Sequence, residues 1–466
     1  DPEYAYLFNA LLVRSGKVPY HRDHPGTTVQ TIGALTQLVL SPTRNASESL
    51  QDLIRAPEEH LIAYARATQI VGFLVLACAA YLVGLAVNSW ALGLVFFALP
   101  LFNPTLWEYA HRYMPDFLTL ALACLVSALG LLRPSPRSAI ASGLVLGAIF
   151  TTKITALPIA LIPFITFYGN WPLFRRFLLS TAMGGFVFGL PLLFSPVNTA
   201  FYIFHTLPVI VFRANGGVPF GPAILLASAA KLLAASPLHI LGYCAGFLFL
   251  FSLRKIRPWQ ARVNEGLLAG VGLSGLSAHL LICATDGSPR HLIPAAAYSS
   301  LLVVLALSRF VNLPKLRKFF GPAAASLSIL GASFAFFSAR SELMASNLMG
   351  LHEESFRQID AEAARLGCKL IPHSPESSNT DTLYFGLDWG NYFTMRLFAP
   401  ELNAAYPDVR FYSTTRARLE RFGFEPAEDS GESICVYSRS DLAKDARFSE
   451  ALNTSYGLKL FRMNAH

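Results

Sequence analysis

Residues 69–102, QIVGFLVLACAAYLVGLAVNSWALGLVFFALPLF, contain no charged side chain. A helix needs about 20 predominantly apolar residues to cross the hydrocarbon core of a bilayer. This stretch therefore predicts one crossing at 67–87 and a shorter apolar segment at 90–103. The apolar residues run continuously instead of alternating, which favours helices over a transmembrane barrel. Only 14% of the chain is charged and 53% is hydrophobic, whereas soluble domains carry about 25% charged residues. We therefore predict an all-α polytopic membrane protein.

Further apolar runs flank this stretch, and charge, Pro and Gly separate them. Their lengths predict about 10–11 transmembrane helices. Segments 27–40, 47–60 and 222–235 read as interfacial or re-entrant helices. The chain begins on a polar segment without Met, so we expect a further helix ahead of Asp1. The remaining predicted spans are 117–132, 138–152, 154–169, 177–194, 237–252, 266–284, 292–309 and 320–338.

Basic residues gather in every second loop between the predicted spans. Arg133 and Arg137 share one loop, Arg175 and Arg176 share the next but one, and two later loops are also basic. Short cytoplasmic loops are enriched in Lys and Arg, so we expect these loops to be cytoplasmic and the alternate loops to be extracytoplasmic. A bacterial inner membrane, with the opening segment on its periplasmic side, is the expected location. The later basic residues are Arg254, Lys255, Arg257, Arg262, Arg309, Lys315, Arg317 and Lys318, and the alternate loops lie near 104–116, 153, 195–235 and 285–291.

The charge balance divides the chain near residue 340. Residues 1–339 carry 23 Lys and Arg against 11 Asp and Glu, whereas residues 340–466 carry 14 against 18. Because the positive balance belongs to the membrane part, it gives no reason to expect a nucleic-acid partner. We predict a transmembrane domain at 1–339 and a small extracytoplasmic α/β soluble domain at 340–466. Its predicted strands are CKLI, TLYFGL, VRFYST and ICVYS, and its predicted helix, EESFRQIDAEAARLG, ends on Gly367.

Two of the six cysteines, Cys368 and Cys435, fall on or near the predicted strands of the C-terminal domain. An oxidising compartment permits a disulfide between them, and two free buried thiols fit the sequence equally well. The other four cysteines lie in apolar spans, where we expect them only to pack. They are Cys78, Cys124, Cys244 and Cys283.

Acidic residues are rare in the membrane part and gather at its predicted outer face. Charged groups near a bilayer are expensive and often functional. A carboxylate there can take a proton from an attacking hydroxyl, and nearby Arg and Lys side chains can hold a phosphate. Between Leu61 and Ala339 the acids are Glu108, Asp116, Glu265 and Asp286, and all but Glu265 lie at outer ends. The outer loops also hold His111, Arg112, Lys153, His205, Arg213, Arg290 and His291.

Four elements follow one another on this face: DPEYAY with DHPGTT, HRYMPDFLTLAL, TTKITALPIALIP and SPRHLIPA. Over residues 1–340 they resemble the GT-C fold glycosyltransferases that use polyprenyl-phosphate sugars, a group that includes protein O-mannosyltransferases and aminoarabinose transferases. The resemblance implies an inverting enzyme that moves a sugar from a polyprenyl-phosphate donor to an acceptor hydroxyl on a glycan, lipid or protein. It implies no cofactor and no metal ligands, although a divalent ion is compatible with it.

The resemblance assigns catalytic roles by position. Asp1 corresponds to the general base of the family, Glu3 to its neighbour and Asp116 to the acid of the second outer loop. Lys153 and Arg290 correspond to groups that contact the donor phosphate.

Three further residues complete the predicted donor site: Arg112, His24 and His291. The sequence departs from the family pattern at two of them. Pro-Gly follows His24 where many members have Pro-Pro, and His291 stands where a Tyr is usual.

Each catalytic candidate also has a purely structural explanation. Asp1 can be a solvated acid at the chain end, and Glu3 can cap the helix that follows it. Asp116 can pair with Arg112, as can Glu108, or it can serve as the N-cap before FLTLAL. For Lys153 and Arg290 the alternative is snorkelling at the membrane interface, and for His24 it is shaping a turn.

Two other functions compete with glycosyl transfer. A transporter or lipid flippase would place charges near the bilayer midplane and show inverted repeats. A non-catalytic subunit of a glycan-assembly machine would carry a degenerate site.

Overall fold

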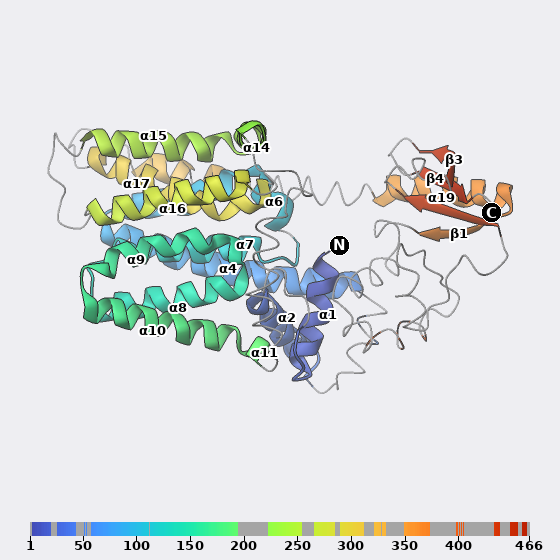
Figure 1. Cartoon of the computed structure of the whole chain (residues 1–466), viewed down its shortest axis with the longest axis horizontal. Coiled ribbons are helices and arrows are strands. Elements are labelled where there is room, and N and C mark those ends of the chain that lie inside the picture. Colours follow the sequence, from blue (N-terminus) through green and yellow to red (C-terminus); the bar gives the residue numbers. More distant parts are fainter. Residues whose placement is uncertain are drawn as a thin grey trace.

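The computed structural model describes an apolar helical bundle and a small C-terminal domain that contains a sheet (Figure 1). The described residues are 2–19, 26–42, 51, 53, 57–110, 112–193, 222–253, 265–284, 289–311, 321–327, 329–331, 349–372, 398, 400, 402, 404, 433–438, 448–454 and 459–463.

Helices of very different length make up the bundle. They are α1 (Pro2–Arg14), α2 (Thr27–Leu40), α4 (Pro57–Ala86), α5 (Trp90–Ala98), η1 (Leu99–Phe102), α6 (Pro104–Ala110), α7 (Asp116–Gly130), α8 (Pro136–Thr152), η2 (Ile154–Ala160), α9 (Leu161–Tyr168), α10 (Trp171–Phe188), α11 (Leu190–Leu193), α14 (Pro222–Ala235), α15 (Pro237–Leu253), α16 (Glu265–Ala284), η4 (Pro289–Ala295) and α17 (Ala296–Val311).

Several helix boundaries follow the sequence signals closely. Helix α15 covers the predicted span 237–252, α16 covers 266–284, and α14 coincides with the predicted interfacial helix 222–235. Helices α14 and α15 meet at an angle of 103°. Proline and serine explain other boundaries: Ser135 caps α8 in a reciprocal bond with Ser138, and Pro136 occupies the first turn.

Several predicted elements differ from the structure. The span predicted at 177–194 corresponds to α10, which begins at Trp171 and ends at Phe188. Residues 57–60, which we expected to end an interfacial helix at 47–60, form the first turn of the long helix α4; the rest of that segment lies mostly outside the described residues. The acidic residues of this turn suggested a break between the interfacial helix and the span that follows it, but acidic side chains are favourable at the start of a helix. Span 154–169 divides into η2 and α9, because Pro158 lies inside the first part and cannot donate a backbone hydrogen bond.

Three helices among the described residues are long and apolar enough to cross a membrane, within 59–86, 266–283 and 290–308. The bent pair α14–α15 adds a fourth if it is counted as one span. Other apolar helices, such as α7 with 15 residues, are shorter. The structure thus supports a helical membrane fold, and the number of 10–11 crossings stays a prediction.

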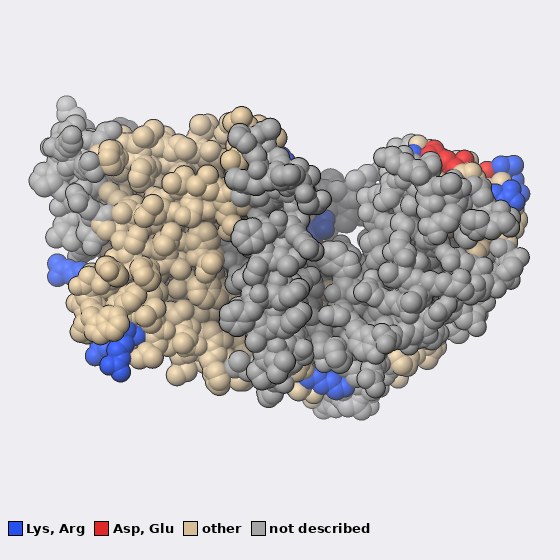
Figure 2. Space-filling view, viewed as in Figure 1, with Lys and Arg blue, Asp and Glu red and all other residues tan. Residues whose placement is uncertain are grey.

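The surface of the bundle is consistent with a lipid environment. Large apolar side chains point outward, including Leu74, Leu179, Leu248 and Leu276. Figure 2 shows a broad uncharged area over the helices, with Lys and Arg at its edges. Exposed arginines flank the α7–α8 and α9–α10 turns, which lie at the left end of the bundle in Figure 1. They are Arg133, Arg137, Arg175 and Arg176.

Helices α8 and α10 approach each other unusually closely. Gly143 and Gly147, one turn apart on α8, lie against the backbone of α10, where an added Cβ would collide with Phe177 O and Gly185 N, respectively. Small residues at this spacing let membrane helices pack backbone to backbone. The contact fixes the direction of α8 and hence the position of Lys153 directly after its end.

The N-terminal helices lie at the opposite end of the bundle from the arginine turns (Figure 1). Three buried tyrosines hold them there. The Tyr113 hydroxyl donates to Val29 O of α2 at 2.8 Å, and its ring contacts those of Tyr6 on α1 and Tyr64 on α4 edge to face. On α1, Phe8 also contacts the ring of Phe398, and both join the bundle core together with Leu402.

The C-terminal domain combines α19 (Met349–Leu366) with four strands: β1 (Lys369–Pro372), β2 (Ile434–Ser438), β3 (Phe448–Asn453) and β4 (Lys459–Met463). The order is β1-β2-β4-β3, with β1 parallel to β2 and the other pairs antiparallel. Gly367, with φ of 62°, ends α19 as predicted. Strands β1 and β2 match CKLI and ICVYS, whereas TLYFGL and VRFYST lie outside the described residues.

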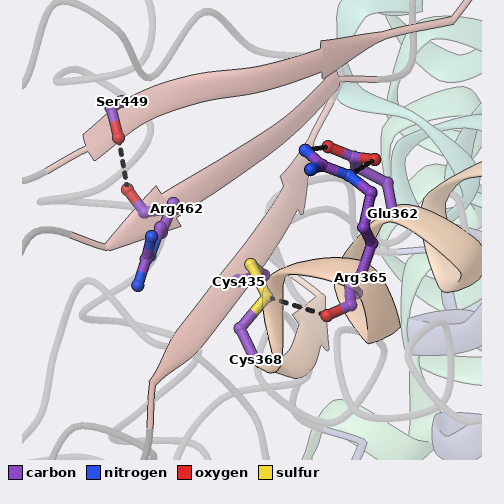
Figure 3. Close-up of a disulfide and its surroundings, with 7 residues drawn as sticks. Glu362, Arg365, Cys368, Cys435, Ser449 and Arg462 are labelled. Atoms are coloured by element: carbon purple, nitrogen blue, oxygen red, sulfur yellow. Dashed lines mark hydrogen bonds and ion pairs between the residues drawn. A yellow bond between two sulfur atoms is a disulfide. The ribbon is translucent and has the colours of Figure 1, made fainter.

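A disulfide joins Cys368 to Cys435, with their Cα atoms 5.5 Å apart. Figure 3 shows it between the end of α19 and strand β2. Of the two alternatives that the sequence left open, the structure has the disulfide. It links residues 67 positions apart and so ties the helix to the sheet.

Candidate functional site

Three charged side chains meet at the end of the bundle that faces the N-terminal helices. Lys153 Nζ donates a hydrogen bond to Asp116 Oδ1. The guanidinium of Arg290 donates to the same carboxylate, from Nη2 to Oδ2 at 3.0 Å and from Nε to Oδ2 at 3.1 Å. Asp116 and Lys153 are fully buried and the Arg290 side chain is 17% exposed. One carboxylate thus holds two cations, and this group is called the inner cluster below.

Each member of the inner cluster lies at or directly beside the end of a helix. Asp116 is the first residue of α7, Lys153 is the C-cap of α8, and Arg290 lies in the first turn of η4. Helices α7 and α8 are consecutive and run in opposite directions, so the start of one lies beside the end of the other. A helix of 15 residues is about 22 Å long, which separates Asp116 from the exposed Arg133 beyond the other end of α7.

A second pair lies on the solvent side of these charges. Glu3, in the first turn of α1, contacts Arg112 with 3.6 Å between Oε1 and Nε. The Arg112 side chain is 34% exposed and that of Glu3 is 13% exposed. The ring of Tyr109 joins the two groups, because the guanidinium carbons of Arg290 and Arg112 lie 5.0 and 5.9 Å from its centroid. Glu3, Tyr109 and Arg112 are called the outer cluster below.

Burial raises the pKa of the Glu3 carboxyl above its ordinary value, while the charge of Arg112 and a hydrogen bond from the Tyr113 backbone oppose this shift. The charge of Arg290 also acts on Glu3, so the two clusters share one electrostatic environment. A carboxylate with a raised pKa accepts a proton more readily at moderate pH.

The start of α2 docks on the end of α8. Gly26 N donates to Thr152 O at 3.2 Å and Thr27 Oγ1 donates to Thr151 O at 3.0 Å. Gly26 has a left-handed backbone, with φ of 59°, which suits glycine. The contact joins the DHPGTT element to the TTKITALPIALIP element. All four sequence elements therefore have residues at this one end of the bundle.

The structural alternatives for Asp116 and Lys153 are wrong. Pro115, not Asp116, occupies the N-cap position of α7, and the Asp116 carboxylate pairs with Lys153 and Arg290 instead of Arg112. Lys153 does not snorkel, since it is fully buried. These alternatives assumed local partners, whereas the real partners are 37 and 174 positions from Asp116.

Other predicted site residues are described partly or not at all. Asp1 and His24 lie outside the described residues, as do His111, His205 and Arg213, and so does the side chain of Glu108. His291 follows Arg290 in η4 and is partly buried. The roles assigned to all of these residues stay predictions.

Sequence reasoning missed Tyr109 altogether. It precedes Arg112 by three positions at the end of α6, a spacing that brings side chains together on a helix. That spacing was the available signal, but it said nothing about Arg290. Among the described residues, no group of three or more His, Cys, Asp and Glu side chains is placed to hold a metal ion.

No protein-family model matches the sequence, and no curated protein matches it. Two crystal structures of ArnT from Cupriavidus metallidurans are similar in fold, one in the apo state with a TM-score of 0.55 and one bound to undecaprenyl phosphate with a TM-score of 0.51. Each is 12% identical in sequence, and the match covers 99% of this chain and 93% of that one. The likeness supports the GT-C fold for an integral membrane protein.

Proposed function

We propose that this protein is an inverting glycosyltransferase that moves a sugar from a polyprenyl-phosphate donor to an acceptor hydroxyl. The observation that carries the proposal is the joining of Asp116, Lys153 and Arg290 at one end of a bundle with the GT-C fold. A similar fold binds undecaprenyl phosphate in one ArnT structure. The fold supplies the setting, and the charged residues supply the chemistry.

The reaction needs a base and a site for the leaving phosphate. The base takes the proton of the acceptor hydroxyl, whose oxygen forms a bond to the anomeric carbon. The bond between that carbon and the phosphate oxygen breaks with inversion, and the polyprenyl phosphate leaves with the electron pair. Because nearby cations stabilise the phosphate charge, neither a general acid nor a metal ion is required.

Asp1 is the proposed base, and Glu3, in the first turn of α1, is its neighbour in sequence. The raised pKa of Glu3 supports a role in proton transfer for this pair. Asp116 is held by two cations, which makes it a poor proton acceptor. Its proposed catalytic contribution is therefore to position Lys153 and Arg290 toward the phosphate. The further donor contacts are proposed for Arg112, His24 and His291.

We place the site on the extracytoplasmic side, most simply the periplasmic side of a bacterial inner membrane. The exposed arginine turns at the other end of the bundle support this orientation. The disulfide supports an extracytoplasmic C-terminal domain, since disulfides persist in oxidising compartments. The division into domains 1–339 and 340–466, and the total of 10–11 spans, belong to the same proposal.

A turnover assay tests the function. Purified protein in detergent is incubated with polyprenyl-phosphate sugars that differ only in the sugar, and the release of free polyprenyl phosphate is measured. Wild type should release it with at least one donor and a suitable glycan, lipid or protein acceptor, whereas Asp1→Asn should abolish release without changing the thermal unfolding midpoint. Wild-type rates in Asp1→Asn would eliminate the proposed base.

The same assay separates the competing functions. A transporter or flippase would move the donor without breaking its sugar–phosphate bond, and a non-catalytic subunit would at most bind it. The position of the described charged clusters at one end of the bundle, not at mid-depth, favours transfer over transport.

A further inference from the structure

Tyr109 contacts both arginines that surround the candidate site. Its ring centroid lies 5.0 Å from the guanidinium carbon of Arg290 and 5.9 Å from that of Arg112. Tyr109 lies on α6 and Arg112 in the turn that follows, but Arg290 comes from η4, far along the chain. The ring is therefore the common contact of two cations from distant parts of the sequence.

Two guanidinium groups in one small region repel each other unless something compensates. Asp116 compensates Arg290, and Glu3 lies 3.6 Å from Arg112. The negative face of an aromatic ring attracts cations by about 0.5–2 kcal/mol, more when water is excluded. Tyr109 thus lowers the free energy of holding both charges together without adding a negative charge that would repel an anionic ligand.

The hydrogen bonds of Arg290 indicate where a ligand would sit. Nε and Nη2 donate to Asp116, and within the described part of the chain Nη1 has no hydrogen-bond acceptor. Asp116 fixes one edge of the planar guanidinium, so the direction of Nη1 is set in advance. A phosphate that binds there gains a donor that needs no reorientation.

We propose that Tyr109 is a positioning residue that holds Arg112 and Arg290 as a two-arginine seat for the donor phosphate. This proposal rests on the proposed function and extends it to a residue that no sequence element singled out. Tyr109 acts through the arginines and takes no part in bond breaking. Replacing the ring should therefore weaken phosphate binding much more than it slows transfer from a saturated enzyme.

The binding test uses undecaprenyl phosphate added to the purified full-length protein in detergent. Tyr109→Leu should raise its Kd about tenfold, within the range of one partly desolvated cation–π contact. Tyr109→Phe keeps the ring and should bind within about twofold of wild type. Tyr168→Leu is the matched control, since Tyr168 is an exposed tyrosine on α9, and it should leave Kd unchanged.

A double-mutant cycle separates positioning from a general loss of structure. In the Arg112→Gln background, Tyr109→Leu should have a clearly smaller effect on Kd than in wild type, because the contact between the ring and Arg112 has already gone. In turnover, Tyr109→Leu should raise KM for the donor and leave kcat within about threefold of wild type.

The outcomes distinguish the two proposals. If wild type does not bind undecaprenyl phosphate, the proposed function is wrong and the phosphate seat is wrong with it. If wild type binds but Tyr109→Leu binds equally well, only the role of Tyr109 is wrong. Equal effects of Tyr109→Leu in both backgrounds, with a lower unfolding midpoint, would show that the ring merely stabilises α6.

Discussion

The inner and outer clusters contain the same kinds of charge but hold them differently. In the inner cluster Asp116 and Lys153 are fully buried, and Arg290 bonds the same carboxylate at 3.0 Å. In the outer cluster the nearest approach of Arg112 to Glu3 is 3.6 Å, and the Arg112 side chain is 34% exposed. A buried ion pair resists rearrangement, whereas a partly exposed one exchanges partners at little cost. We infer that the inner cluster is a fixed frame that keeps one arrangement, whereas the outer cluster can rearrange when substrate binds.

Replacing Asp116 should break the inner cluster and give the largest effect. Asp116→Asn leaves Lys153 and Arg290 without their counter-charge, and removal of one member of a buried pair destabilises a protein by about 3–5 kcal/mol. The unfolding midpoint in detergent should fall sharply and transfer should be lost.

The double variant Asp116→Asn/Lys153→Met should recover part of the unfolding midpoint, because it removes one of the unpaired charges. Asp360→Asn, at an exposed acid of α19, is the control and should change neither property. A wild-type midpoint in Asp116→Asn would contradict the idea of a fixed frame.

Glu3→Gln should separate activity from stability. The variant keeps the shape of the side chain and loses its charge, and loss of a group that assists proton transfer typically slows a reaction by 10²–10⁴-fold. We expect kcat to fall by about 10²-fold while the unfolding midpoint stays close to wild type. Glu59→Gln, at an exposed acid of α4, should have wild-type kcat. A drop in stability as large as that of Asp116→Asn would remove the distinction between the clusters.

The pH dependence of kcat/KM should report the environment of Glu3. Burial raises the Glu3 pKa above its ordinary value of 4.5, so activity that needs the ionised form should fall as pH drops through that raised pKa. This fall at low pH is the acid limb of the profile of kcat/KM against pH. Arg112→Gln removes a charge that lowers the pKa of Glu3, so it should move the acid limb to higher pH. Arg137→Gln, at the other end of the bundle, should leave the limb in place.

The same raised pKa has a consequence for folding. The contribution of Glu3 to stability is fully present below pH 4.5 and is lost as pH rises through the folded-state pKa. For the activity profile, an acid limb of kcat/KM that does not move in Arg112→Gln would show that a group other than Glu3 controls the pH dependence.

The smallest effect should be that of Arg112→Gln on stability. Pairs with an exposed member contribute about 0–1 kcal/mol, so the unfolding midpoint should change by only a few degrees. Differential scanning fluorimetry of Arg112→Gln and Asp116→Asn in parallel would measure the smallest and the largest expected change in the unfolding midpoint. A loss as large as that of Asp116→Asn would mean that the outer cluster is as fixed as the inner one.

Local features of the sequence predicted much of the fold. Apolar run length located α15 and α16 to within one residue at each end, and Gly367 marked the end of α19. These signals act over a few residues, so a single chain reveals them. The interruption at Pro158 was visible too, but the length of the surrounding apolar run concealed it.

The candidate site was only partly predictable, because its contacts join distant positions. Lys153 and Arg290 were selected, but nothing near them in sequence revealed Asp116 as their common acceptor. Tyr109 carries no charge and lies at a predicted outer end, so it was indistinguishable from an ordinary interfacial aromatic. Only tertiary packing brings its ring to Arg290.

The contact between Phe8 and Phe398 has a consequence for biosynthesis. Helix α1 carries Glu3, yet part of the surface that packs against it is translated nearly 400 residues later. At 5–20 residues per second, that delay is on the order of 20–80 s. A nascent bundle can join Asp116 to Lys153 early, but the helix that bears Glu3 cannot reach its final packing until Phe398 has left the ribosome. Transfer activity would then begin only in chains that already include the segment around Phe398.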